Sequence, residues 1–196
     1  MSVLNLTPIA NPIIPSYSPP LLTAEEFFAQ YENKRAELIR GVVKELPMPF
    51  VDHGHICGLM TYFLTDFARQ HGLGRVMSND SFVRLRHSPD TVRGPDVCFF
   101  SYARLPKGPI PRGLLDAVPE LVVEVRSPSD SWSELITKVL DYLAAGVTAV
   151  VVFNPERLAV AVYRAAVDEE HFSIEQELTI PDVLPGFTVP VRKLFE

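Results

Sequence analysis

The chain has 196 residues, of which 47% are hydrophobic and 21% charged, and its formal net charge is −6. This length suits one domain around a single core, and the composition excludes an intrinsically disordered chain. The net charge excludes a protein that binds polyanions through its overall charge alone. The two cysteines, Cys57 and Cys98, lie far apart in the sequence, so we expect buried free thiols and neither a zinc site nor a disulfide framework.

The first twenty residues contain five prolines and few charges, which predicts an extended N-terminal arm over residues 1–20 and a domain over residues 21–196. This segment lacks the basic region and the small-residue cleavage site of a signal peptide. No apolar run in the sequence reaches the length of a membrane span. We therefore expect a cytoplasmic protein that does not associate with membranes.

The first half of the chain predicts two helices and several strands. Thr23 and Glu26 form a capping box for a short helix that ends near residue 33. Residues 37–46 predict either two strands joined tightly at a glycine or one bent strand. A second helix is predicted over residues 52–71, followed by a strand over residues 75–87 with one solvated, basic face.

The second half alternates strands with one helix. It begins with a buried strand at residues 96–100, a long loop at 101–119 and a central strand at 120–125. A helix capped by Ser129 or Asp130 and ending at Gly146 follows, with Leu140 among the residues expected to face the core. Strands at 148–153 and 158–165 predict a hairpin. The predicted fold class is α/β (α+β), with a mixed sheet and helices on its faces.

Positive charge is concentrated in one part of the chain. Residues 69–113 contain eight basic and three acidic residues, a net charge of +5, so the remaining residues carry −11. Either this stretch is an ordinary solvated surface, or it faces the phosphates of a nucleic acid.

Two predicted strands contain an acid where an apolar residue would be more stable. Asp96 begins "DVCFF", and Glu124 lies within "LVVEVRS". An ionised carboxylate in the core costs several kcal/mol, about the penalty for a buried ion, unless a positive charge lies close to it. Lys138, on the helix after Glu124, is a candidate for that charge. The alternative is that Lys138 forms an ordinary surface ion pair with Glu134, one turn earlier on the same helix.

These features resemble the PD-(D/E)xK nuclease superfamily and, within it, the Uma2 family (DUF820), whose members resemble restriction endonucleases. The resemblance covers residues 21–194. It is carried by His55 and by the segments "AELIRG" (36–41), "GPDV" (94–97), "PELVVEVRSPSDS" (119–131), "KVLDYLAAGV" (138–147) and "NPE" (154–156). It implies a restriction-endonuclease-like mixed β-sheet flanked by helices.

The resemblance also implies a set of site residues. Asp96 and Glu124 would bind Mg²⁺ or Mn²⁺, Lys138 would complete the site, and Glu37 would add an acid. Hard carboxylate oxygens suit these cations, whose waters can attack a phosphodiester. The chain departs from the simplest superfamily pattern, because Arg126 stands two residues after Glu124, where the simplest pattern has lysine. An arginine cannot exchange a proton with water, so Lys138 must take the role of that lysine.

Other polar residues are assigned around this set. Arg93, Arg126, Arg84 and Arg86 are candidate phosphate contacts. Tyr142 lies one turn after Lys138 and is expected to orient the site. His55 is expected either to orient the site through a hydrogen bond or to serve only as a helix-start residue. His53 and His55 are two positions apart, so they point in different directions on a helix and make a poor two-histidine metal site.

The leading prediction is a metal-dependent endonuclease that hydrolyses DNA, with the basic stretch beside the phosphate backbone. Cutting both strands of a duplex generally needs two active sites, so we expect a homodimer. One alternative is a catalytically inactive member of the fold that binds nucleic acid or acts in assembly. Another is a hydrolase of a different phosphoester, because nothing in the sequence indicates the recognition of bases or sugars.

Overall fold

The computed structural model describes residues 20–128 and 130–196, so the predicted arm lies outside the described residues apart from residue 20. Within this part the helices are α1 (Ala24–Tyr31), α2 (Val51–Gln70) and α3 (Trp132–Ala144), with the 3-10 helices η1 (Pro155–Arg157) and η2 (Val191–Leu194). The strands are β1 (Ala36–Ile39), β2 (Val42–Glu45), β3 (Gly74–Ser78), β4 (Val83–Arg86), β5 (Thr91–Arg93), β6 (Val97–Ser101), β7 (Leu121–Val125), β8 (Ala149–Asn154), β9 (Ala159–Tyr163), β10 (Glu170–Phe172), β11 (Glu177–Thr179) and β12 (Thr188–Pro190). None of the helices described is both long and apolar enough to cross a membrane.

The main sheet has six strands in the order β10-β9-β8-β7-β6-β3. Only β7 and β8 pair in parallel, and α3 connects them, while the other neighbours are antiparallel. Both β7 and β8 are buried along their whole length, which is typical of strands that are covered on both faces. This arrangement confirms the predicted mixed sheet, with residues 121–125 as a central strand.

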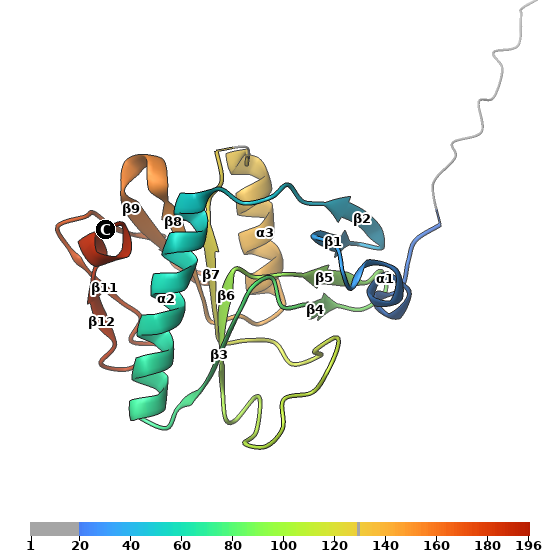
Figure 1. Ribbon diagram of the computed structural model, residues 1–196, viewed down its shortest axis with the longest axis horizontal. Helices are drawn as coiled ribbons and strands as arrows, with labels where there is room; N and C mark the ends of the chain where they lie inside the picture. The colour runs from blue at the N-terminus through green and yellow to red at the C-terminus, as the bar shows by residue number, and fades with distance from the viewer. Residues whose placement is uncertain (1–19, 129) are drawn as a thin grey trace, which may run out of the picture.

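Helices α2 and α3 cover opposite faces of this sheet (Figure 1). Because successive side chains of a strand point to opposite faces, Val123 and Val125 pack with α2 whereas Val122 packs with α3. Glu124 is two residues after Val122, so its side chain points to the same face of the sheet. The sequence of β7 therefore directs the Glu124 carboxylate toward α3.

A second sheet of four strands, in the order β2-β1-β5-β4, lies with α1 beside the main sheet (Figure 1). β1 and β2 form a tight hairpin, which confirms the first of the two readings of residues 37–46. Its two turn residues, Arg40 and Gly41, have φ values of 50° and 81°, and two successive left-handed residues match the right-handed twist of the strands. β1 also pairs with β5, where Leu38 faces Val92, and this pairing places Glu37 close to Arg93.

The structure corrects three of the sequence predictions. Residues 75–87 form two strands, β3 and β4, which belong to different sheets, and not one strand. The chain bends between them at Asn79 and Asp80, whose φ values are 66° and 55°. The cap of α3 is Ser131, whose hydroxyl accepts a hydrogen bond from the amide of residue 134. Leu140 is 59% exposed and does not face the core. The capping box of α1, the helix α2, the loop after β6 and the β8–β9 hairpin are confirmed.

Candidate active site

Glu124 lies at the carboxyl end of β7 and is 4% exposed. Both of its oxygens contact α3: Oε2 lies 2.7 Å from Lys138 Nζ, and Oε1 accepts a 2.7 Å hydrogen bond from the Tyr142 hydroxyl. Lys138 and Tyr142 are one helical turn apart, so they share the face of α3 that meets the sheet. The predicted contact between Lys138 and Glu124 is therefore confirmed, and Glu134 instead pairs with Lys44.

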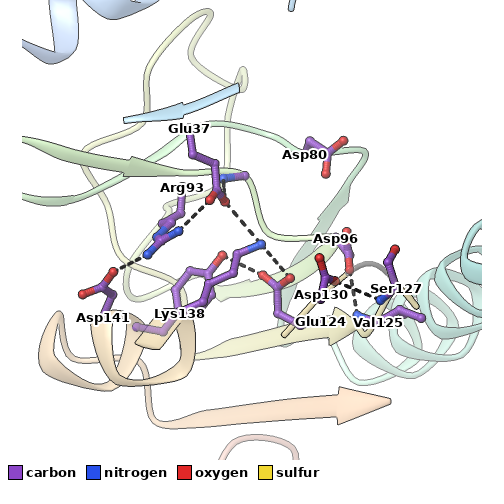
Figure 2. Close-up of polar contacts among 12 residues, drawn as sticks. Glu37, Asp80, Arg93, Asp96, Glu124, Val125, Ser127, Asp130, Lys138 and Asp141 are labelled. Carbon is purple, nitrogen blue, oxygen red and sulfur yellow. Dashed lines mark hydrogen bonds and ion pairs between the residues drawn. The ribbon is translucent and has the colours of Figure 1, made fainter. Parts of the chain in front are cut away.

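Asp96 immediately precedes β6 and is 7% exposed. Its Oδ2 accepts a 2.7 Å hydrogen bond from the Val125 amide and lies 3.2 Å from His53 Nε2 on α2. Because β6 is the neighbour of β7 and Val97 faces Val123, Asp96 lies near the same end of the sheet as Glu124. Figure 2 shows Glu124 against the Lys138 side chain and Asp96 beside the Val125 amide.

Glu37 enters the site from the four-stranded sheet and is 2% exposed. Its Oε2 accepts a 2.6 Å hydrogen bond from Arg93 Nη1, and its Oε1 lies 3.2 Å from Lys138 Nζ. The other end of the Arg93 guanidinium donates to Asp141 of α3 at 2.5 Å. Lys138 therefore bridges two acids that come from different sheets (Figure 2).

The buried carboxylates share too little positive charge for all of them to ionise easily. The pKa of Glu124 is raised to about 8, chiefly by burial and also by the charges of Asp96 and Glu37, against the opposing effect of Lys138. Burial acts in the same direction on Glu37 and Asp96, but their cationic neighbours outweigh it, so both pKa values are lowered. The surrounding acids outweigh burial for Lys138 as well and raise its pKa, so the lysine is an ammonium ion.

Two hollows meet beside these residues. The larger, of about 610 Å³, is lined by α1, the segment before α2 and the loop after β6, and the smaller, of about 330 Å³, is lined by His53, Cys57 and Asp96. Arg35 and Asp80 line both hollows and form an ion pair of 2.9 Å where they meet. Solvent and small ions thus reach Asp96 from the α2 side.

The structure corrects the prediction that Arg93 and Arg84 contact phosphates at the surface. Arg93 is buried against two carboxylates, and Arg84 is buried against Glu25 and Asp116. A buried guanidinium whose charge is already paired is poorly placed to contact a phosphate at the surface. Its role is instead to keep its carboxylate partner ionised and in place.

The other predicted arginines lie nearer the surface. Arg126 donates to Glu156 at 2.7 Å and lies over the Trp132 ring, 5.1 Å from its centroid, so its charge is also paired. Arg86 is exposed beside a hollow next to the site. Arg75 faces Phe100, at the end of the main sheet opposite Asp96, so the basic stretch does not form one surface beside the candidate site.

His53, and not His55, contacts the site. His55 is exposed, whereas His53 is buried on the face of α2 that contacts Asp96. Burial lowers the pKa of His53, but the Asp96 carboxylate outweighs this effect and raises it overall. The sequence contained a signal for this residue: His53 continues the stripe of Ile56 and Met60 by one helical turn, while His55 lies off that stripe.

Comparison with protein-family models matches residues 24–192 to Uma2, described as "Putative restriction endonuclease". The chain belongs to the Uma2 family. A search of curated proteins found no match. Among solved structures, a DUF820 protein from Anabaena variabilis ATCC 29413, described as a putative nuclease, is similar with a TM-score of 0.79 and 22% sequence identity. The match covers 89% of this Uma2 chain and 97% of the other, and shows that the two share a fold.

Proposed function

We propose that this Uma2 protein is a metal-dependent endonuclease that hydrolyses DNA phosphodiester bonds. The observation that carries the proposal is the position of Lys138, whose ammonium lies within 3.2 Å of both Glu37 and Glu124 at the end of the sheet where Asp96 lies. An ammonium ion beside several buried acids is an arrangement that stabilises negative charge as it develops on a reacting phosphate. The family description supports a nuclease.

The residues present fit a hard divalent cation. Asp96 and Glu124 offer carboxylate oxygens from adjacent strands, and both contacts of Asp96 described above use Oδ2, which leaves Oδ1 for a cation. Burial and, after it, the charges of Asp96 and Glu37 raise the pKa of Glu124, and a cation bound there would favour its ionised form. Mg²⁺ or Mn²⁺ held there would polarise the scissile phosphate and supply a reactive water.

The protein residues then divide the remaining work. Lys138 acts as a fixed positive charge that stabilises the attacking hydroxide and the charge on the phosphate, because its raised pKa keeps it protonated at neutral pH. Tyr142 holds Glu124 through the hydroxyl hydrogen bond. Arg93 holds Glu37, which in turn contacts Lys138 and so positions the ammonium.

Plasmid nicking with Mg²⁺ or Mn²⁺ tests this proposal. Lys138→Met and Asp96→Asn should each abolish nicking, while Lys44→Met, which removes a largely exposed lysine paired with Glu134, should retain it. Cleavage by Lys138→Met at the wild-type rate would remove Lys138 from the mechanism. Purification of every variant through the same steps controls for contaminating nucleases.

Cation binding is tested separately by thermal unfolding. Mg²⁺ or Mn²⁺ should raise the Tm of the wild-type protein, and Asp96→Asn should remove this increase. An equal response of the two proteins would contradict the metal site. A normal increase without any nicking would support the alternative of a catalytically inactive member that binds nucleic acid.

We also propose that the active form is a homodimer, because the cleavage of both strands of a duplex generally needs two sites. Light scattering coupled to gel filtration measures the mass directly. A value near twice the chain mass of 21.9 kDa is expected, and a monomer that cuts both strands would contradict the proposal.

A further inference from the structure

His53, Cys57 and Asp96 bring three different metal-binding groups together on the α2 side of the candidate active site. One ligand atom from each residue lies within 4.8 Å of the others. His53 and Cys57 are four residues apart on α2 and therefore share a face, with Cys57 Sγ 3.5 Å from His53 Nδ1. The opposite ring nitrogen of His53, Nε2, lies 3.2 Å from Asp96 Oδ2.

There is room for a cation beside these groups. All three residues line the hollow of about 330 Å³, so the ligand atoms do not lie in a closed core. Gly54 and Gly58 line the same hollow, and a Cβ atom at either glycine would meet nothing within 4 Å. This face of α2 thus leaves space for an ion and for the water that would complete its coordination.

We propose that His53, Cys57 and Asp96 form a second cation site, which binds Zn²⁺ or a similar borderline transition metal in preference to Mg²⁺. A nitrogen, a sulfur and a carboxylate oxygen are the donors of three-ligand zinc sites, whereas Mg²⁺ prefers oxygen alone. Zinc bond lengths imply donor separations of about 3.4–3.8 Å in a tetrahedral site. The present separations reach at most 4.8 Å, and Cys57 and Asp96 now face different ring nitrogens of His53, so the side chains would have to turn for one imidazole nitrogen, the thiolate and the carboxylate to meet a single cation.

This site differs from the proposed Mg²⁺ site although both use Asp96. Glu124 faces α3 and contacts Lys138 and Tyr142, while Cys57 belongs to α2 on the other side of the sheet. Because one carboxylate serves both, occupation of the α2 site would draw Asp96 away from Glu124. The existence of the second site does not depend on the proposed function, since it rests only on the three ligands and the hollow.

Absorption spectroscopy with Co²⁺ in place of Zn²⁺ tests the site directly, because a cobalt–thiolate bond gives a charge-transfer band in the near ultraviolet. The full chain without a reducing thiol should show this band at one equivalent of Co²⁺. Cys57→Ala should lose it. Cys98→Ala is the matched control and should keep it, because Cys98 is buried on the α3 face of the sheet.

Zn²⁺ affinity, measured by competition with a chromophoric chelator, provides a second readout. His53→Ala should weaken binding by at least about 10-fold, since even the loss of an outer partner of a ligand costs about 10- to 100-fold. His55→Ala should leave the affinity unchanged, because its side chain is exposed. If Cys57→Ala fails to fold, Cys57→Ser replaces it. A third readout is the alkylation rate of Cys57, measured in Cys98→Ala so that no other cysteine reacts, and Zn²⁺ should slow this reaction.

Three results would overturn the proposal: no band in the wild-type protein, a band that persists in Cys57→Ala, or the same alkylation rate with and without Zn²⁺. The first and the third would mean that the 3.5 Å contact between Cys57 and His53 is an ordinary thiol hydrogen bond, and the second would assign the cobalt–thiolate bond to Cys98. None of these measurements requires DNA cleavage, so a failure of the proposed nuclease function is recognised separately. If both proposals hold, Zn²⁺ should inhibit nicking in the wild-type protein and much less in Cys57→Ala.

Discussion

Replacing Glu124 with glutamine should flatten the pH dependence of stability in the metal-free protein. The folded chain raises the pKa of Glu124 from an ordinary 4.5 to about 8, so it holds this proton more tightly than the unfolded chain does. The stabilising effect of the proton is complete below pH 4.5 and is lost as the pH rises through 8. At 1.36 kcal/mol per pKa unit, wild-type stability should fall by about 3–4 kcal/mol between pH 5 and 8.

Urea denaturation in EDTA at pH 5, 6.5 and 8 measures this slope. Glu124→Gln should lose most of the decrease, because the amide cannot titrate while its oxygen can still accept a hydrogen bond from Lys138. The raised pKa of His53 adds a decrease in an overlapping window, above pH 6.5, and most of it remains in Glu124→Gln because Asp96 contributes more to this shift than Glu124 does. The lowered pKa values of Glu37 and Asp96 act at lower pH, outside the window.

Glu134→Gln is the matched control for this experiment. Glu134 lies on α3 near Lys138, but it is exposed and pairs with Lys44, so its replacement should leave the wild-type slope unchanged. Parallel profiles of the wild-type protein and Glu124→Gln from pH 5 to 8 would refute the reasoning. They would mean that Glu124 is already ionised in the metal-free fold.

Two further predictions concern residues around the site. Arg93→Met should lower the free energy of unfolding by about 3–5 kcal/mol, because it leaves the buried Glu37 carboxylate on β1 without its arginine partner. Arg86→Met removes an exposed charge and should change the free energy of unfolding by less than about 0.5 kcal/mol. Urea denaturation of both variants at pH 7 measures the difference, and equal values would contradict the prediction. His53→Ala should reduce the rate of nicking and shift its pH profile, because it removes a hydrogen-bond donor to Asp96, a proposed metal ligand. His55→Ala should keep the wild-type rate and pH profile, because its side chain is exposed. Identical profiles of the two variants would show that the His53 imidazole does not position the site.

The central part of the fold was predictable because its signals are local and strong. β7 and β8 are apolar runs in which Glu124 and Asn154 are the only polar residues, and the repeat of α3 placed Lys138 one turn from Tyr142. For Lys138, the cost of burying an acid favoured a contact with Glu124, but it left the surface pair with Glu134 open, and the resemblance to the nuclease superfamily decided between them. The strands and the helix required only the composition of each segment.

The environment of the arginines was not predictable, because it depends on contacts between distant segments. Arg84 follows a strand pattern that alternates apolar and basic residues, which is typical of a solvated face, yet Asp116 of a later loop and Glu25 of α1 cover it. The break at Asn79 and Asp80 was missed because it divides one alternating run between two sheets. Such tertiary contacts override a pattern that describes a single strand.

The bridge between the two sheets has a consequence for native-state opening. Glu37 and Arg93 belong to the four-stranded sheet, but their partners Lys138 and Asp141 belong to α3, so the two layers cannot separate without breaking these ion pairs. Lys138→Met removes the contact with Glu37 and should lower the free energy of this opening. Amide hydrogens of β1 and β5 should then exchange faster with deuterium, although the substitution lies on α3.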